Sequence, residues 1–211
     1  MTELGLRERK KLRTKQLIAD TAAKLFAERG FDAVTVADIA RAAEVSEKTV
    51  FNYFRTKEEL VFSGMEDFGA ALLQVIRERP QGVSVLTAFA ELVVRPQGLL
   101  AADDPQAIER LAAVARMIAA SNTLRARERQ VFDDCAAALA DALAEETGAA
   151  DADIEPWVVA NALIGVQRAS TAYIHREVLA GRRGPDLVDD VLTQARRAIA
   201  VLEQGFGDYP G

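Results

Sequence analysis

The sequence predicts an all-α fold of about nine helices, and three observations lead to this prediction. Ala, Leu, Glu, Arg and Gln, which favour helices, dominate the composition. Apolar residues recur at steps of three and four, the spacing of one face of a helix. Alternating runs of β-branched and polar residues, which are typical of half-buried strands, are nearly absent.

The N-terminal part is expected to contain three helices and the start of a fourth. The first spans residues 9–29 and ends at Gly30. A short helix follows Thr35, which has capping-box spacing to Asp38. Ser46 begins another short helix that ends near residue 53. Thr56 and Glu59 match a capping box more closely, and they begin a long helix that ends near residue 80.

The remaining helices are marked by their caps and breaks. Asp104 followed by Pro105 is a helix start, and Ser121 caps the next helix. Gly148 ends that helix, and Gly181 and Gly184 separate the last two. The expected ranges are residues 83–94, 105–120, 122–147, 153–180 and 186–204.

Composition excludes several classes of protein. Half of the 211 residues are apolar and 27% are charged, which excludes a disordered chain. One cysteine, Cys135, and one histidine, His175, exclude an intrachain disulfide and a structural metal site built on these residue types. We expect neither a metal nor a cofactor. The longest strongly apolar stretch, residues 156–167, is shorter than the roughly 20 residues that span a bilayer. No signal peptide is visible, and we expect a cytoplasmic protein without membrane contact.

The charges are distributed unevenly along the chain. Residues 1–60 hold 12 basic and 10 acidic side chains, whereas residues 61–211 hold 14 and 22. A basic end on an acidic chain favours a local contact with a polyanion, although a solvated, frayed terminus explains it equally well. The basic arm, within about residues 1–15, contains Arg7, Arg9, Lys10, Lys11, Arg13 and Lys15.

Residues 35–60 carry the most specific pattern in the chain. Two short helices are separated by a turn, with Ala40 at their close approach and Val45 as an apolar plug in the turn. Val50 and Phe54 are four residues apart and are expected to face the core. This is the pattern of a helix-turn-helix. The outer side of its second helix then offers Glu47, Lys48, Thr49, Asn52 and Tyr53 for contacts with bases or phosphates.

This segment resembles the helix-turn-helix of the TetR family of bacterial transcriptional regulators. The match extends over about residues 10–62, including the first-helix residues 22–31. The resemblance implies a helix-turn-helix DNA-binding domain in residues 1–55. It also implies a larger helical domain in residues 56–211 for effector binding and dimerisation. The matching motif positions are Thr35, Ile39, Ala40, Ala43, Val45, Ser46, Thr49, Phe51, Tyr53, Phe54, Lys57 and Leu60.

The resemblance implies DNA contacts for Thr35, Lys48, Thr49, Asn52, Tyr53 and Lys57. Thr35 would contact a phosphate at a helix N-terminus, or serve only as a cap. Asn52 is the candidate for pairing with adenine. Tyr53 would contact phosphate or sugar, or pack in the core, and Lys57 would face a phosphate.

Two departures from the family pattern bear on DNA recognition. Lys48 stands where glycine is frequent, which adds a charge and should alter sequence preference. Phe51 stands where tyrosine is frequent, so one hydroxyl contact to phosphate is missing. The basic arm would supply added phosphate contacts or reach into the minor groove.

The resemblance further implies a small-molecule pocket in the C-terminal domain and a homodimer formed through the last two helices. Arg168 is expected to be buried and paired with an acidic residue on another helix, or with an acidic ligand. Trp157 would fill the core or cover a ligand, and His175 is expected at the surface. The candidate ligand-binding residues are Phe89, Met117, Trp157, Asn161, Ile164 and Arg168.

These features together predict a ligand-responsive DNA-binding regulator, a repressor released from a palindromic operator by a small-molecule effector. The effector is unknown, and the C-terminal half is similar to the subgroup with acyl-CoA-type effectors. No catalytic motif is present, so an enzyme is not expected. Two alternatives remain: an effector-independent helical DNA-binding dimer, and an interaction module that has lost sequence-specific DNA reading.

Overall fold

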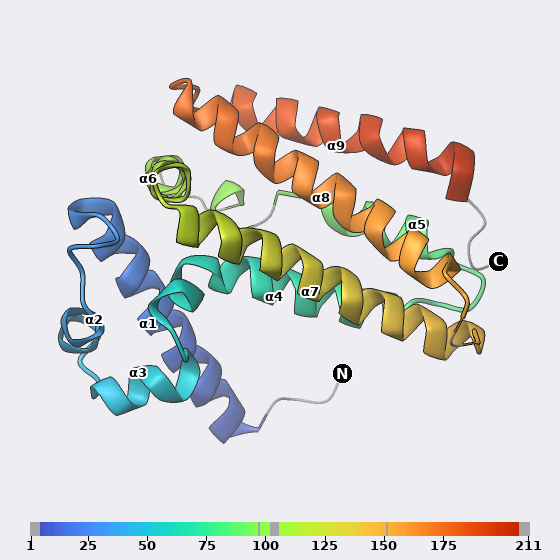
Figure 1. The fold of residues 1–211 in the computed structure, drawn as a ribbon. Helices are drawn as coiled ribbons and strands as arrows, with labels where there is room; N and C mark the ends of the chain where they lie inside the picture. The colour runs from blue at the N-terminus through green and yellow to red at the C-terminus, as the bar shows by residue number, and fades with distance from the viewer. Residues whose placement is uncertain (1–4, 97, 102–105, 151, 207–211) are drawn as a thin grey trace.

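The computed structural model describes residues 5–96, 98–101, 106–150 and 152–206. These residues form nine α-helices and one short 3₁₀ helix, with no strand among them (Figure 1). The all-α prediction is confirmed. The helices are α1 (Leu6–Arg29), α2 (Val36–Ala42), α3 (Glu47–Tyr53), α4 (Lys57–Glu78), α5 (Val85–Val93), η1 (Gly98–Leu100), α6 (Ala107–Ala120), α7 (Asn122–Thr147), α8 (Glu155–Leu179) and α9 (Pro185–Phe206).

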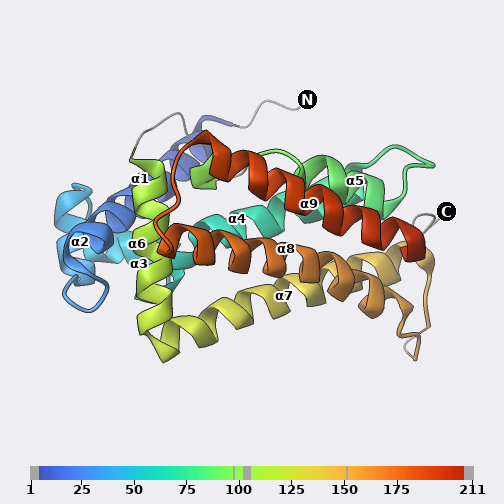
Figure 2. The same cartoon turned by 90° about the horizontal axis from the view of Figure 1, so that it is seen from above.

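The helices fall into two groups in space. Helices α1, α2 and α3 gather at one end of the molecule, and α4, α5, α7, α8 and α9 form a bundle beside them (Figure 1). Helix α6 crosses the bundle at the end nearest to α1 (Figure 2). None of the described helices is long and apolar enough to cross a bilayer.

The cap of α2 follows the sequence pattern, whereas the cap of α4 departs from it in one hydrogen bond. The Asp38 N–H donates to the Thr35 hydroxyl at 3.1 Å, and the Thr35 N–H donates to the Asp38 carboxylate at 3.0 Å. The predicted capping box is therefore confirmed. At α4 the Glu59 N–H donates to the Thr56 hydroxyl at 3.3 Å. The Glu59 carboxylate, however, accepts from the N–H of Arg55 at 2.6 Å, one residue earlier than in a capping box.

The bounds of α7 match the prediction, and the bounds of the other helices differ from it by a few residues at most. Ser121 caps α7, and Gly148 ends it in the left-handed conformation, as predicted. Helix α1 begins at Leu6, so residues 7–15 are helical, and a frayed terminus is wrong for them. The predicted Asp104–Pro105 start lies outside the described residues.

Two apolar cores are linked by α4. The N-terminal core contains Ile18, Phe26, Ile39, Val50 and Phe54, and also buried residues at the α6–α7 junction. The C-terminal core is formed by α4, α5, α7, α8 and α9. The first turns of α4 contribute Leu60 and Phe62 to the N-terminal core, and its second half contributes Leu72 and Ile76 to the C-terminal core.

One titratable pair is largely buried between α7 and α8. The Nδ1 atom of His175 lies 3.7 Å from Oε1 of Glu128, and the two side chains are only 17% and 20% exposed. The surface position expected for His175 is therefore wrong. Burial lowers the pKa of His175 and raises the pKa of Glu128. Glu128 Oε1 has no hydrogen-bond partner among the described residues.

We predict that Glu128→Gln stabilises the protein at neutral pH. The folded-state pKa of Glu128 lies above its ordinary value of 4.5, so its ionised form opposes folding. This cost is fully present above the folded pKa and disappears as the pH falls toward 4.5. The difference in melting temperature between Glu128→Gln and wild type should therefore be positive at pH 7.5 and shrink toward pH 4.5.

Thermal unfolding monitored by circular dichroism across this pH range measures the difference. The matched control is Asp141→Asn, which removes an exposed carboxylate from the same helix. Equal shifts for the two variants at every pH would contradict the burial argument.

Candidate nucleic-acid interface

The turn between α2 and α3 is closed by backbone and apolar contacts. The Val45 N–H donates to the Ala40 carbonyl at 2.9 Å. Ala40 and Ala43 are buried, and Val45 packs against the same N-terminal core. Glu44 takes a positive φ of 54°, which lets the chain reverse between the two helices. The predicted helix-turn-helix seam is thus present.

Helix α3 has one face in the core and one face in solvent. Val50 is buried on this helix and Phe54 directly after it, as their four-residue spacing predicts. On the other side, Lys48, Phe51 and Asn52 are exposed. Short polar side chains and a cation on an anchored, exposed helix are the groups that read base edges and phosphates in a major groove.

The other predicted DNA-contacting residues of α2 and α3 also hold the fold together. The Thr49 and Ser46 hydroxyls lie 2.8 Å apart at the start of α3. Tyr53 is half-buried against the N-terminal core. The Thr35 hydroxyl donates to the Asp38 carboxylate at 2.6 Å. The cap role of Thr35 is therefore confirmed, and the DNA contacts of these residues stay predictions.

Lys57 fastens the start of α4 to the loop between α1 and α2. Its Nζ donates to the carbonyls of Phe31 at 2.9 Å and Val34 at 3.2 Å. The same ammonium lies 4.0 Å from the centre of the Phe31 ring, within cation–π range. Lys57 thus has a structural role that sequence reasoning missed, and its phosphate contact stays a prediction.

The basic arm is part of α1, and it contacts α4. The Nζ of Lys15 lies 2.6 Å from the Asp67 carboxylate. Residues 7–14 of the arm are helical, and their side chains are exposed, apart from half-buried Thr14. An exposed basic helix beside the helix-turn-helix is suited to phosphate contacts, because these depend on charge and not on base sequence.

The structure does not bring the predicted ligand-binding residues together. Phe89 and Ile164 are buried in the C-terminal core, whereas Met117 packs against the N-terminal core. Trp157 is 48% exposed, so it does not fill the core. Asn161 is exposed, and its side-chain amide donates to the Trp157 carbonyl at 2.8 Å.

Arg168 departs from its prediction in one respect and follows it in another. Its side chain is 46% exposed, so the expected burial is wrong. The expected partner is present, because Arg168 Nη2 lies 2.7 Å from the Asp133 carboxylate of α7. An exposed pair of this kind needs no ligand to neutralise it.

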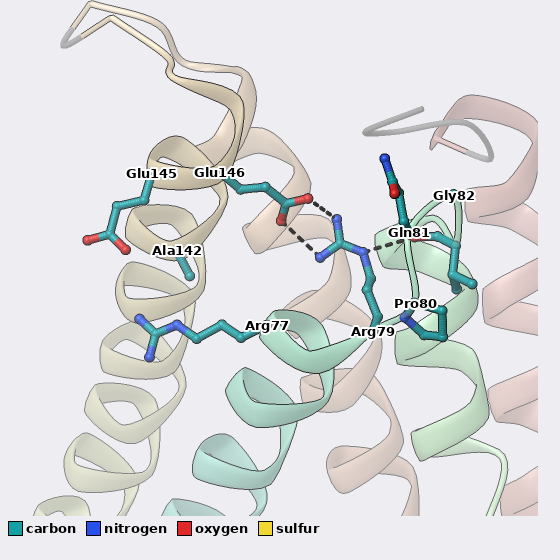
Figure 3. Close-up of a pocket in the computed structure, with 9 residues that line it drawn as sticks. Arg77, Arg79, Pro80, Gln81, Gly82, Ala142, Glu145 and Glu146 are labelled. Carbon is teal, nitrogen blue, oxygen red and sulfur yellow. Dashed lines mark hydrogen bonds and ion pairs between the residues drawn. The ribbon is translucent and has the colours of Figure 1, made fainter.

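An open groove of about 770 Å³ lies elsewhere, at the ends of α4 and α7 (Figure 3). Arg79 crosses it and forms a two-pronged ion pair with Glu146, while its Nε donates to the Val83 carbonyl at 2.9 Å. No residue of the predicted ligand set lines this groove. Its lining is Arg77, Arg79, Pro80, Gln81, Gly82, Val83, Ala142, Glu145 and Glu146.

Comparison with known proteins finds a matching family for each of the two parts of the chain. Residues 18–63 match the family described as bacterial regulatory proteins, tetR family, and residues 83–206 match the MftR C-terminal domain. The chain belongs to the TetR family. The second match covers more than half of the sequence, including α5 to α9.

Curated relatives of this TetR-family protein are transcriptional regulators. It is 26% identical over 167 residues to MftR of Mycobacterium tuberculosis, named as a mycofactocin biosynthesis regulator, covering 79% of this chain and 81% of MftR. It is 36% identical over 86 residues to TcmR of Streptomyces glaucescens, covering 41% of this chain and only 38% of TcmR.

Solved structures share the fold at low sequence identity. A TetR-family regulator from Mesorhizobium loti aligns with a TM-score of 0.54 at 17% identity, covering 92% of this chain and 96% of that one. The fatty acid degradation regulator FadR from Bacillus halodurans aligns with a TM-score of 0.53 at 22% identity, covering 94% and 97%.

We predict that Lys57→Met lowers the stability of this TetR-family protein by about 1–3 kcal/mol, because it removes hydrogen bonds from a charged donor to half-buried carbonyls. Chemical denaturation measures the change in the free energy of unfolding. The control is Lys48→Met, which removes an exposed ammonium and should leave the stability within about 0.5 kcal/mol of wild type. Equal stability of the two variants would show that the Phe31 and Val34 contacts do not hold α4.

Proposed function

We propose that this protein is a ligand-responsive repressor. A homodimer would bind a palindromic operator through α3 and release it when a small-molecule effector binds in the C-terminal domain. The observation that carries the proposal is the anchored α3. Its inner side is fixed by Val50 and by Phe54 next to its end, and its outer face exposes Lys48 and Asn52. Membership of the TetR family supports a transcriptional regulator.

The two exposed polar residues of α3 suit different DNA groups. The amide of Asn52 can pair with the N6 and N7 positions of adenine in the major groove. The ammonium of Lys48 lies one helical turn earlier, and as a flexible point charge it suits a phosphate or a guanine edge. Asn52 would then contribute sequence preference. For Lys48 we propose the phosphate contact, which contributes mostly affinity, in place of the altered sequence preference expected from its departure from the family pattern.

Dimerisation through α8 and α9 is supported by large apolar side chains that are exposed on both helices. These two helices lie side by side at one face of the molecule (Figure 2). Exposed apolar groups on adjacent helices are typical of an interface with another chain. A dimer would place two α3 helices in successive major grooves, about 34–36 Å apart. The exposed apolar residues are Trp157, Val158, Leu179 and Val201.

Helix α4 is the proposed route from effector to DNA. It is tied to α7 by Glu66 and Arg127, whose charged atoms lie 2.9 Å apart, and to α1 by the Lys15–Asp67 pair. Movement of α7 would therefore shift α4, and with it the spacing of the two α3 helices. A coupling of about 1–3 kcal/mol suffices for a 5- to 150-fold loss of operator affinity.

An effector-independent DNA-binding dimer is the second candidate. The observation that favours it is the filling of the C-terminal core by Phe89, Leu139, Leu163 and Ile164. A thermal-shift screen separates the two candidates, because a ligand that binds only the folded state must raise its stability. Acyl-CoA-type and other hydrophobic molecules are the first to screen, and a hit should also weaken operator binding.

Selection of binding sites from a random DNA pool tests the proposed function. Sequencing should show enrichment of a palindrome with half-sites about 10 base pairs apart, because a two-fold dimer binds successive major grooves. The wild-type protein is first shown to be folded and dimeric by circular dichroism and sedimentation. Absence of any enriched sequence from such protein would favour a module that has lost sequence-specific reading.

Asn52→Ala and Lys48→Ala should weaken operator binding in different ways. Loss of the Asn52 amide should cost about 1–3 kcal/mol on the selected site and relax preference at one position of each half-site. Loss of the Lys48 ammonium should weaken binding to matched and mismatched sites alike. It should also reduce the slope of log K against log salt concentration by about one for each phosphate that is no longer neutralised. Titrations of both variants on matched and mismatched DNA at several salt concentrations measure this, and the reverse pattern would exchange the two roles.

A further inference from the structure

Phe51 is an exposed aromatic side chain on α3, the helix proposed to bind DNA. It is 49% exposed. The other large apolar side chains that are exposed in the described part of the chain lie on α1, on α8 and α9, or at Ile154 just before α8. About half of the Phe51 side chain stays exposed in the free protein, so this part of the ring is available for a contact with DNA.

The register of α3 places Phe51 among the DNA-reading residues. Phe51 follows Lys48 by three positions, which puts the two side chains on neighbouring parts of one face. Asn52 is the next residue and is also exposed, while Val50 on the other side is buried. When α3 lies in a major groove with Asn52 at a base edge, Phe51 therefore faces the same groove within one or two base pairs.

The chemistry of the ring selects what it can contact there. A phenyl ring has no hydroxyl, so it cannot donate a hydrogen bond to a phosphate oxygen. The edges of base pairs in the major groove carry hydrogen-bonding groups and one prominent apolar group, the C5-methyl of thymine. Contact between this methyl and an apolar side chain removes both from water.

We propose that Phe51 packs against a thymine C5-methyl in each half-site and so specifies thymine at that position. This inference rests on the proposed function, because it needs a sequence-specific operator. It adds a second base determinant to the adenine contacted by Asn52, and this determinant is apolar. The selected palindrome should therefore contain thymine within about two base pairs of that adenine.

Replacement of thymine by deoxyuridine tests the contact, because it removes the methyl and leaves the hydrogen-bonding groups unchanged. Operators selected with wild-type protein are synthesised with deoxyuridine at one symmetric pair of thymine positions at a time. At the position that Phe51 contacts, affinity should fall about 4-fold per half-site, or about 15-fold for the dimer, since burial of one methyl is worth about 0.8 kcal/mol.

Phe51→Ala supplies the second half of a double-mutant cycle. This variant should bind the thymine operator more weakly than wild type, and deoxyuridine at the contacted position should cost it less than 2-fold. Lys48→Ala is the matched control: it should bind more weakly overall but keep the full deoxyuridine effect. Phe51 is exposed, and circular dichroism checks that Phe51→Ala melts as wild type does.

The outcomes separate this inference from the proposed function. Failure to select any operator refutes the function before Phe51 is tested. An operator that binds wild type equally well with deoxyuridine at every thymine position refutes the methyl contact and leaves the function intact. Equal deoxyuridine effects in wild type and Phe51→Ala show that another residue contacts the methyl, which also overturns the inference.

Discussion

The membership of α4 in two apolar cores is the constraint on which the rest of the structure depends. Leu60 and Phe62 pack with the helix-turn-helix, while Leu72 and Ile76 pack with α5, α7, α8 and α9. A continuous helix of 22 residues is about 33 Å long and transmits displacement along its axis. A change in the packing of either core therefore affects the other through one continuous helix.

Polar contacts reinforce this helix at defined points. Lys57 holds its first turn to the loop before α2, Asp67 binds Lys15 of α1, and Glu66 binds Arg127 of α7. Partly exposed ion pairs add little to stability. The importance of the two ion pairs is geometric: together with the Lys57 hydrogen bonds they constrain the rotation of α4 relative to α1, α7 and the loop before α2.

The sequence predicted what is local and missed what depends on packing between distant segments. The Thr35–Asp38 box and the Gly148 cap involve residues close in the chain, so spacing alone identified them. The helix-turn-helix could be predicted for the same reason, because its residues lie close together in the chain. The Lys57 contacts join residues 23 and 26 positions apart, and the burial of His175 depends on α7 lying against α8. No local pattern contains that information.

The predicted ligand-binding residues of α8 show the same limit of prediction from local sequence. The spacing of Trp157, Asn161 and Arg168 places them on one face, but α8 is apolar on most sides, so spacing does not say which face points inward. The structure exposes these three, whereas Ile164 is buried in the C-terminal core, to which Phe89 also belongs. An effector that enters this core must displace side chains that share it with the second half of α4. Effector binding and movement of α4 would then be the same packing event, because a close-packed core moves between discrete arrangements and does not yield at one point alone.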